Sequence, residues 1–167
     1  MKPTSVRQDT GITNRKHADT GLMGRALIMT LDGEKPIRDL KPGDRIITRD
    51  TGTAILKDVR VRRITGCAVR IKASSLGHNR PEHDATLPAG QPILVRDWRA
   101  QALFGAKQVL VPAARLVDGE FVTLHTDAAM TVYDLEFDSP HVLYVDGLEV
   151  ASYLGDTSIV QPNMQQK

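Results

Sequence analysis

The chain has 167 residues, 41% of them apolar, which can bury one ordinary hydrophobic core and favours a single domain over two. Its 22 basic and 20 acidic side chains leave a net charge of +2, so charge gives no reason to expect nucleic acid or an anionic membrane as a partner. The single cysteine, Cys67, excludes an internal disulfide and a multi-cysteine metal site.

Both ends of the chain are predicted to be tails. Residues 1–20 contain too few aliphatic side chains to offset the entropy of ordering them, so we expect disorder there. The folded domain is expected to span residues 21–155, and residues 156–167 form a polar tail. Because no run approaches the ~20 apolar residues that cross a bilayer and no secretory signal is present, we expect no membrane association and place the chain in the cytoplasm by default.

Between the tails the pattern is typical of β structure. Three Asp-Gly pairs predict tight turns, because glycine accepts the positive φ that such turns require, and apolar or β-branched runs flank each pair. The pairs are Asp32-Gly33, Asp118-Gly119 and Asp146-Gly147. Strands are predicted at Ala26–Leu31, Arg45–Thr48, Ala54–Ile64, Ala68–Ala73, Pro92–Val95, Val109–Val111, Phe121–His125, Met130–Phe137 and Val142–Val150.

Helix is predicted only at Arg99–Phe104 and at Pro112–Leu116, where Pro112 suits a first helical position. Many short strands joined by close turns favour an all-β domain over a βαβ unit. The sequence therefore predicts a mainly antiparallel β domain with little helix.

Four blocks of the sequence resemble the Hint domain family, which includes hedgehog C-terminal domains, inteins and related bacterial domains. In order they are "TLDGEKPIRDLKPGDRIITRDTG", "RIKASSLGHNRPEHD", "ALFGAKQVLVPAARLVDG" and "VYDLEFDSPHVLYVDGLEVAS". The resemblance runs from about Gly21 to Tyr153 and is closest to the bacterial members. It implies a compact antiparallel β domain whose two related halves share one core, and a relation to self-cleaving, protein-splicing domains.

The resemblance places the family's nucleophile on Gly21. A Hint domain begins with a cysteine, or sometimes a serine, that attacks the carbonyl of the preceding residue, and such covalent catalysis needs a nucleophilic sulfur or oxygen. Counting back from the Asp32-Gly33 turn, that position is Gly21, followed by Leu22. Glycine has no side chain, so the expected nucleophile is absent.

The remaining family positions are only partly kept. The family's histidine, which donates a proton to the departing nitrogen, falls on Gln91, and an amide does not titrate near neutral pH. The resemblance makes Asp134 and His141 the counterparts of an aspartate and a histidine that assist later steps. The terminal His-Asn pair of inteins falls on Ala151-Ser152, so asparagine cyclisation is not available. We prefer to interpret His141 as a loop or strand-start residue bonded to backbone.

Other candidate residues are better explained by structural roles. Cys67 is interpreted as a small buried hydrophobe. The stretch "LGHNRPEHD", with two histidines, is interpreted as a solvated loop, so no metal or cofactor is expected. Arg60 and Arg62 alternate along one strand and are predicted to be exposed, and Trp98 and Phe104 are predicted to anchor the core.

Two functional hypotheses follow. In the first, the chain is a catalytically inactive Hint domain that persists as a folding or interaction module, and a protein partner is left open. In the second, the domain cleaves itself through an unusual nucleophile, Thr20 or Cys67, with His141 assisting. The first hypothesis explains why the family's cysteine and histidine are replaced by Gly21 and Gln91. We therefore favour the interpretation that the chain is not an enzyme.

Overall fold

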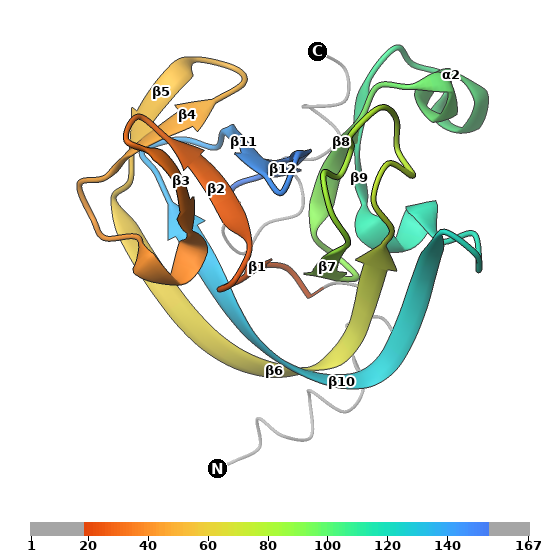
Figure 1. Cartoon of the computed structure of the whole chain (residues 1–167), viewed down its shortest axis with the longest axis horizontal. Helices are drawn as coiled ribbons and strands as arrows, with labels where there is room; N and C mark the ends of the chain where they lie inside the picture. Colours follow the sequence, from red (N-terminus) through yellow and green to blue (C-terminus); the bar gives the residue numbers. More distant parts are fainter. Residues whose placement is uncertain (1–18, 154–167) are drawn as a thin grey trace.

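The computed structural model of the chain describes residues 19–153, which form two β-sheets with few helical turns (Figure 1). Apart from Asp19 and Thr20, the predicted tails lie outside the described residues. The elements, with η marking a 3₁₀ helix, are β1 (Leu22–Met23), β2 (Leu27–Thr30), β3 (Gly33–Pro36), η1 (Ile37–Asp39), β4 (Arg45–Thr48), β5 (Gly52–Ile55), β6 (Asp58–Ile71), β7 (Ala85–Pro88), β8 (Pro92–Val95), α2 (Trp98–Phe104), β9 (Val109–Pro112), η2 (Ala113–Leu116), β10 (Val122–Glu136), β11 (Val142–Val145) and β12 (Leu148–Ala151).

The strands pair antiparallel in both sheets, which confirms the predicted fold class. The four-stranded sheet has the order β1-β10-β6-β7, and the eight-stranded sheet has the order β3-β2-β4-β11-β12-β8-β9, with β5 added to β4. Figure 1 shows β2 to β5 on one side and β7 to β9 with α2 on the other. Strands β6 and β10 pass beneath both groups and connect the two halves of the domain.

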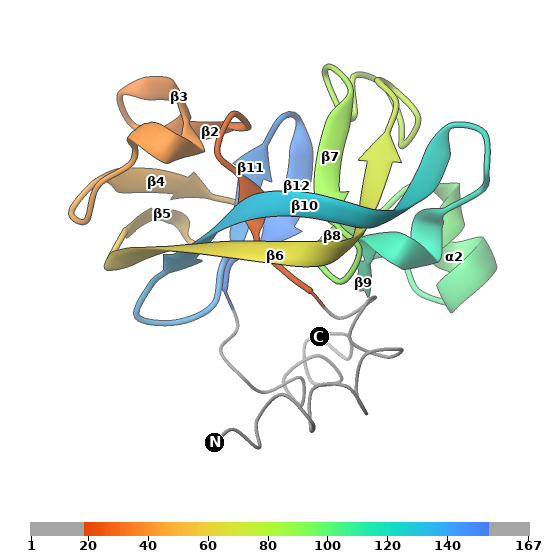
Figure 2. The ribbon, with the colours of Figure 1, turned by 90° about the horizontal axis from the view of Figure 1, so that it is seen from below.

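The two longest strands, β6 and β10, differ from the sequence prediction. Strands were predicted to break near Gly66 and again between His125 and Met130, but β6 and β10 are continuous and run side by side (Figure 2). The two predicted breaks lie opposite each other, with Ala128 paired to Gly66 and a register shift between His125 and Ala128. A bulge absorbs the one extra residue of β10 without ending the strand, so the strand pairing continues past both breaking signals.

The Asp-Gly pairs form hairpins at two of the three positions. Gly33 (φ 101°) joins β2 to β3, and Asp146-Gly147 (φ 53° and 82°) joins β11 to β12. The Val142–Val150 segment is therefore a hairpin rather than one strand. The third pair, Asp118-Gly119, follows η2 instead of a strand, so the prediction of strands on both sides is wrong there.

Short helical turns lie close to where they were predicted. Helix α2 begins one residue before the predicted Arg99, because Asp97 caps it by accepting a hydrogen bond from the backbone N–H of Arg99. Pro112 precedes η2 rather than occupying its first position. None of the helices within residues 19–153 combines the length and the apolar content needed to cross a bilayer.

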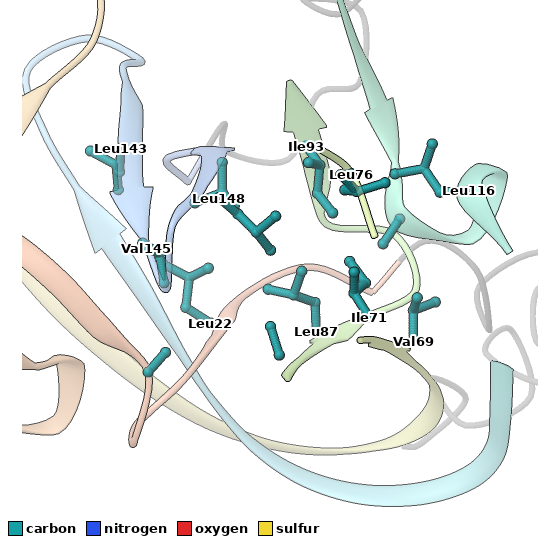
Figure 3. Close-up of a cluster of buried hydrophobic side chains, with 14 of the residues drawn as sticks. Leu22, Val69, Ile71, Leu76, Leu87, Ile93, Leu116, Leu143, Val145 and Leu148 are labelled. Atoms are coloured by element: carbon teal, nitrogen blue, oxygen red, sulfur yellow. The ribbon is translucent and has the colours of Figure 1, made fainter. Parts of the chain in front are cut away.

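The main core lies between the two sheets (Figure 3). Leu22 of β1 is 2% exposed and packs in this core between side chains of β11 and β12 and those of β6 and β7. Phe104 packs against the same core, as predicted. Trp98 does not, because it is 65% exposed at the start of α2, where the Arg99 guanidinium lies over its ring, 4.8 Å from the ring centroid. The prediction for Trp98 is therefore wrong. Burial of Leu22 in the core fixes the position of β1.

Asp118 stabilises the turn that leads into β10. Its Oδ1 accepts hydrogen bonds from the backbone N–H groups of Glu120, Phe121 and Val122, each 2.9 Å long. Burial alone would raise the pKa of Asp118, but these three donors outweigh it and lower the pKa below the ordinary value. The ionised carboxylate is therefore the form that the fold prefers.

Asp118→Ala is expected to lower the free energy of unfolding at pH 7 by about 1 kcal/mol, after allowance for solvent screening of this exposed group. Because the folded-state pKa is depressed, the contribution is present above the unfolded-state pKa and is lost as the pH falls through the folded-state value. Urea unfolding at neutral and acidic pH measures this. Asp138→Ala, which removes a carboxylate that is 92% exposed, is the control, and an equal loss in both variants would contradict the role of the turn.

Candidate functional site

Gly21 is buried immediately before β1, and backbone and side-chain donors and acceptors hold the peptide unit that precedes it. The Asp19 carbonyl accepts a hydrogen bond from the Gly90 N–H at 2.8 Å, and the Thr20 carbonyl accepts one from Arg62 Nη2 at 2.9 Å. The Gly21 N–H donates to Gln91 Oε1 at 2.9 Å. The Thr20-Gly21 peptide bond is thus bound on its carbonyl side and on its nitrogen side.

Gln91 lies in the turn between β7 and β8 and is 3% exposed. Its Nε2 donates to the carbonyl oxygens of Ala151 at 2.8 Å and Pro92 at 3.2 Å. Since both of these neighbours are acceptors and Gly21 N–H is a donor, only one orientation of the amide satisfies all three groups. The group facing the Gly21 nitrogen is therefore a carbonyl oxygen, which has no proton to donate.

Asp134 reaches the same site through an arginine. Its carboxylate, on β10, is buried and accepts two hydrogen bonds from Arg62, at 2.7 Å from Nε and 3.1 Å from Nη2. Donation of hydrogen bonds to the Asp134 carboxylate is the main cause that raises the pKa of Arg62, and burial of the guanidinium opposes it. Asp134 therefore orients the cation that holds the Thr20 carbonyl.

The backbone at Gly21 leaves no room for a side chain. Its φ is +128°, a conformation that glycine adopts readily and other residues rarely. A Cβ atom on Gly21 would lie 2.7 Å from Val132 Cβ, 3.0 Å from Val132 Cγ2 and 3.4 Å from Asp134 Oδ1. Val132 thus fills the space next to Gly21, the residue on which the resemblance places the family's nucleophile.

His141 lies near the C-terminal end of the described residues, immediately before β11. Its N–H donates to Ser152 Oγ and its carbonyl accepts from the Ser152 N–H, both at 2.9 Å. The imidazole Nδ1 is 2.9 Å from Asp50 Oδ2, and the ring packs edge-on against Phe137. Within residues 19–153 no hydrogen bond or ion pair joins His141 to Asp134. The structure brings Gly21 and Gln91 together and links Asp134 to them through Arg62. His141 instead contacts Ser152, the residue on which the resemblance places the terminal asparagine of inteins.

The other candidates have ordinary structural surroundings. Cys67 is 1% exposed in the main core, and its carbonyl accepts a hydrogen bond from the Ala89 N–H. His83 pairs with Asp146, and Asp84 accepts from the Ala73 N–H. No group of three or more potential metal-binding side chains gathers within the described part of the chain.

Arg62 is the site residue that the sequence interpretation missed. Arg60 is exposed and pairs with Glu136, as expected for a surface position, but Arg62 is only 35% exposed and bridges Asp134 to the Thr20 carbonyl. The prediction of an exposed face is therefore wrong for Arg62. The available signal was Asp134 itself, because it alternates with the apolar Met130 and Val132 on one strand face, and a carboxylate buried there needs a partner.

Comparisons with known proteins identify the family and the fold. A family model described as the Hint domain matches residues 20–157. Among solved structures, a bacterial intein-like domain from Clostridium thermocellum is 19% identical with a TM-score of 0.60 and covers 81% of this chain and 99% of its own. The TvoVMA intein is 14% identical, with a TM-score of 0.56 and coverage of 79% and 96%. A DnaB intein from Synechocystis is 14% identical, with a TM-score of 0.51 and coverage of 81% and 100%. No curated protein sequence matches the chain. At these identities the structural likeness is one of fold.

Proposed function

The chain belongs to the Hint domain family, and we propose that it is a member that has lost autoprocessing and acts as a folding or interaction module. The hydrogen bond from the Gly21 N–H to Gln91 Oε1 carries this proposal. It joins the two positions at which the family resemblance expects a nucleophile and a proton donor. Here those positions hold a residue without a side chain and a hydrogen-bond acceptor.

The first step of autoprocessing has two chemical requirements. A sulfur or oxygen on residue 21 must attack the carbonyl carbon of residue 20, forming a thioester or ester as the C–N bond breaks, and the released nitrogen must gain a proton. Gly21 supplies no attacking atom, and the oxygen of Gln91 cannot supply the proton. Both requirements are unmet at the same peptide bond.

The remaining contacts favour the intact peptide. Arg62 donates to the Thr20 carbonyl, which would activate that carbonyl if a nucleophile were present. Without one, the same hydrogen bond anchors the segment that enters β1. Gln91 adds a second anchor, because its Nε2 binds the Ala151 carbonyl near the end of the domain. These contacts support a role for the former site in holding the two ends of the fold together.

A reporter protein fused ahead of Met1 tests this proposal. We expect intact mass spectrometry of the purified fusion to show one uncleaved species, with or without added thiol or hydroxylamine, because an uncatalysed amide bond is extremely stable. A self-cleaving intein fused to the same reporter is the positive control. Fragments ending at Asp19, Thr20 or Gly66 would contradict the proposal. An end at Asp19 would favour Thr20 as the nucleophile, and an end at Gly66 would favour Cys67.

A further inference from the structure

Three arginines converge on one buried glutamate on the face of the eight-stranded sheet that points away from the main core. Glu149 of β12 is 4% exposed, and its strand neighbours Leu148 and Val150 point into the main core, so Glu149 points to the opposite face. Arg49 follows β4 and Arg96 follows β8, on opposite sides of β12 in the sheet order. Their side chains meet at Glu149.

The contacts in this cluster are direct. Glu149 Oε1 accepts from Arg96 Nε at 2.7 Å and from Arg80 Nη2 at 3.2 Å. Glu149 Oε2 accepts from Arg49 Nε and from Arg96 Nη2, both at 3.2 Å. Arg49 and Arg96 therefore share a single carboxylate oxygen, which holds two positively charged groups side by side.

The cluster has an excess of positive charge. Three guanidinium groups face one carboxylate, which leaves a local charge of +2, since arginine remains protonated in proteins. The negative charge of Asp97 also acts to raise the pKa of Arg80, but the Asp97 carboxylate is itself paired with Arg99 at 2.6 Å. Among residues 19–153, Glu149 is the only acidic side chain that forms an ion pair with any of the three arginines.

Arg80 is the most buried of the three arginines, with 14% of its side chain exposed, and its Nε is buried without a hydrogen-bond partner. Burial lowers the pKa of Arg80, Glu149 opposes this, and the nearby charge of Arg96 lowers it further. Like charges held this closely are costly unless an anion offsets them. Arg49 and Arg96 remain 32% and 41% exposed, so a ligand in solution can reach their free N–H groups.

We propose that Arg49 and Arg96, held together by Glu149, bind the dianionic phosphate group of a ligand. A charge of −2 matches the surplus of the cluster, whereas a single carboxylate leaves half of it uncompensated. Planar guanidinium groups donate parallel hydrogen bonds to phosphate oxygens, which makes paired arginines suited to this ligand. Tyr144, directly opposite Glu149 in the β11–β12 pair, shares this face. The site does not depend on autoprocessing.

Phosphate titration of the full-length chain at constant ionic strength tests the site. The midpoint temperature of thermal unfolding of the wild type is expected to rise by about 3 to 6 °C at a phosphate concentration roughly tenfold above the dissociation constant, and the rise should saturate. In Arg49→Gln/Arg96→Gln the rise should disappear, while Arg80 and Glu149 remain as a neutral pair. Arg45→Gln/Arg63→Gln removes the same charge at two exposed positions and should retain the wild-type response.

Calorimetric titration of the wild type with phosphate gives an independent measurement that does not rely on the variants, and one site per chain is expected. Phosphoserine distinguishes the source, because tighter binding than phosphate indicates a phosphoryl group carried on a larger molecule and equal or weaker binding indicates the free ion. Acetate is the control for a monoanion. The proposal is overturned if no saturable binding occurs, if acetate binds equally well, or if Arg45→Gln/Arg63→Gln loses the response to the same extent.

Discussion

Arg62→Met is expected to lower the free energy of unfolding by about 3 kcal/mol, the lower end of the range for breaking a buried ion pair by removing one partner. The reason is the carboxylate that remains: the Asp134 side chain is 2% exposed, and both of its ion-pair contacts come from Arg62. The Thr20 carbonyl loses its arginine donor in the same variant. Asp134→Asn should cost less, because the arginine left behind is 35% exposed and can regain water.

Urea unfolding of the two single variants and the double variant measures this pair. Arg62→Met/Asp134→Asn should be less destabilised than the sum of the single variants, since the second change removes the stranded charge. Arg63→Met is the matched control, because Arg63 is the exposed neighbour on the same strand. A loss for Arg62→Met within about 0.5 kcal/mol of the control would show that the pair contributes nothing beyond an ordinary surface contact.

Gly21→Cys, which puts a thiol where the resemblance expects the family's nucleophile, is expected to lower the free energy of unfolding by about 3 kcal/mol. Two costs add: the φ of +128° strains any residue with a Cβ, and that Cβ would lie 2.7 Å from Val132 Cβ. The Val132 Cβ cannot rotate away, because it is fixed to the backbone of β10. Guanidinium unfolding under reducing conditions measures the loss.

Gly43→Cys separates the two costs, because Gly43 has a similar φ of +98° but nothing within 4 Å of an added Cβ. It should lose only the part due to backbone strain. Val132→Gly should cost less in the Gly21→Cys background than alone, since it removes the clashing atom. Equal losses for Gly21→Cys and Gly43→Cys would contradict the steric explanation.

This clash has a consequence for any attempt to restore cleavage. Gly21→Cys with Gln91→His supplies a thiol and a titratable ring, but the thiol has no space beside Val132. We therefore expect that pair of changes alone to leave the domain inactive. In the proposal of an inactive domain, the packing of Val132 against Gly21 therefore contributes as well as the residues at positions 21 and 91.

The turns could be predicted from sequence because their causes are local. Asp146-Gly147 places two consecutive residues at positive φ, and a dipeptide with that preference specifies a hairpin wherever strands flank it. Asp118-Gly119 carries the same signal and yet joins no hairpin, because the helical turn η2 precedes it. The dipeptide predicts the turn but not the elements on either side.

The continuity of β6 and β10 could not be predicted, because it depends on how two distant segments meet. Gly66 looks like a strand breaker when only its neighbours are considered, and so does the segment around Asp127. In the structure each is supported by the other strand, and the bulge before Ala128 accommodates the one extra residue of β10.

The candidate site divides in the same way. The resemblance to Hint domains singled out Gly21 and Gln91, and in the structure a hydrogen bond joins these two residues. It gave no information about Arg62 or Val132, whose importance follows from contacts across 42 residues in one case and from a steric approach in the other. Asp134 indicates that a buried partner is needed but does not identify Arg62, and the approach of Val132 to Gly21 has no signal in the sequence.

Gln91 binds the backbone where the described fold begins and where it ends, through Gly21 and Ala151. Entry and exit are therefore separated by a single carboxamide group. A chain with this arrangement can be inserted into a loop of another protein without forcing that loop's ends apart, and its own ends can be rejoined by a short linker with new termini opened elsewhere. The close approach of its two ends thus suits the domain to insertion into other proteins, and this does not require self-cleavage.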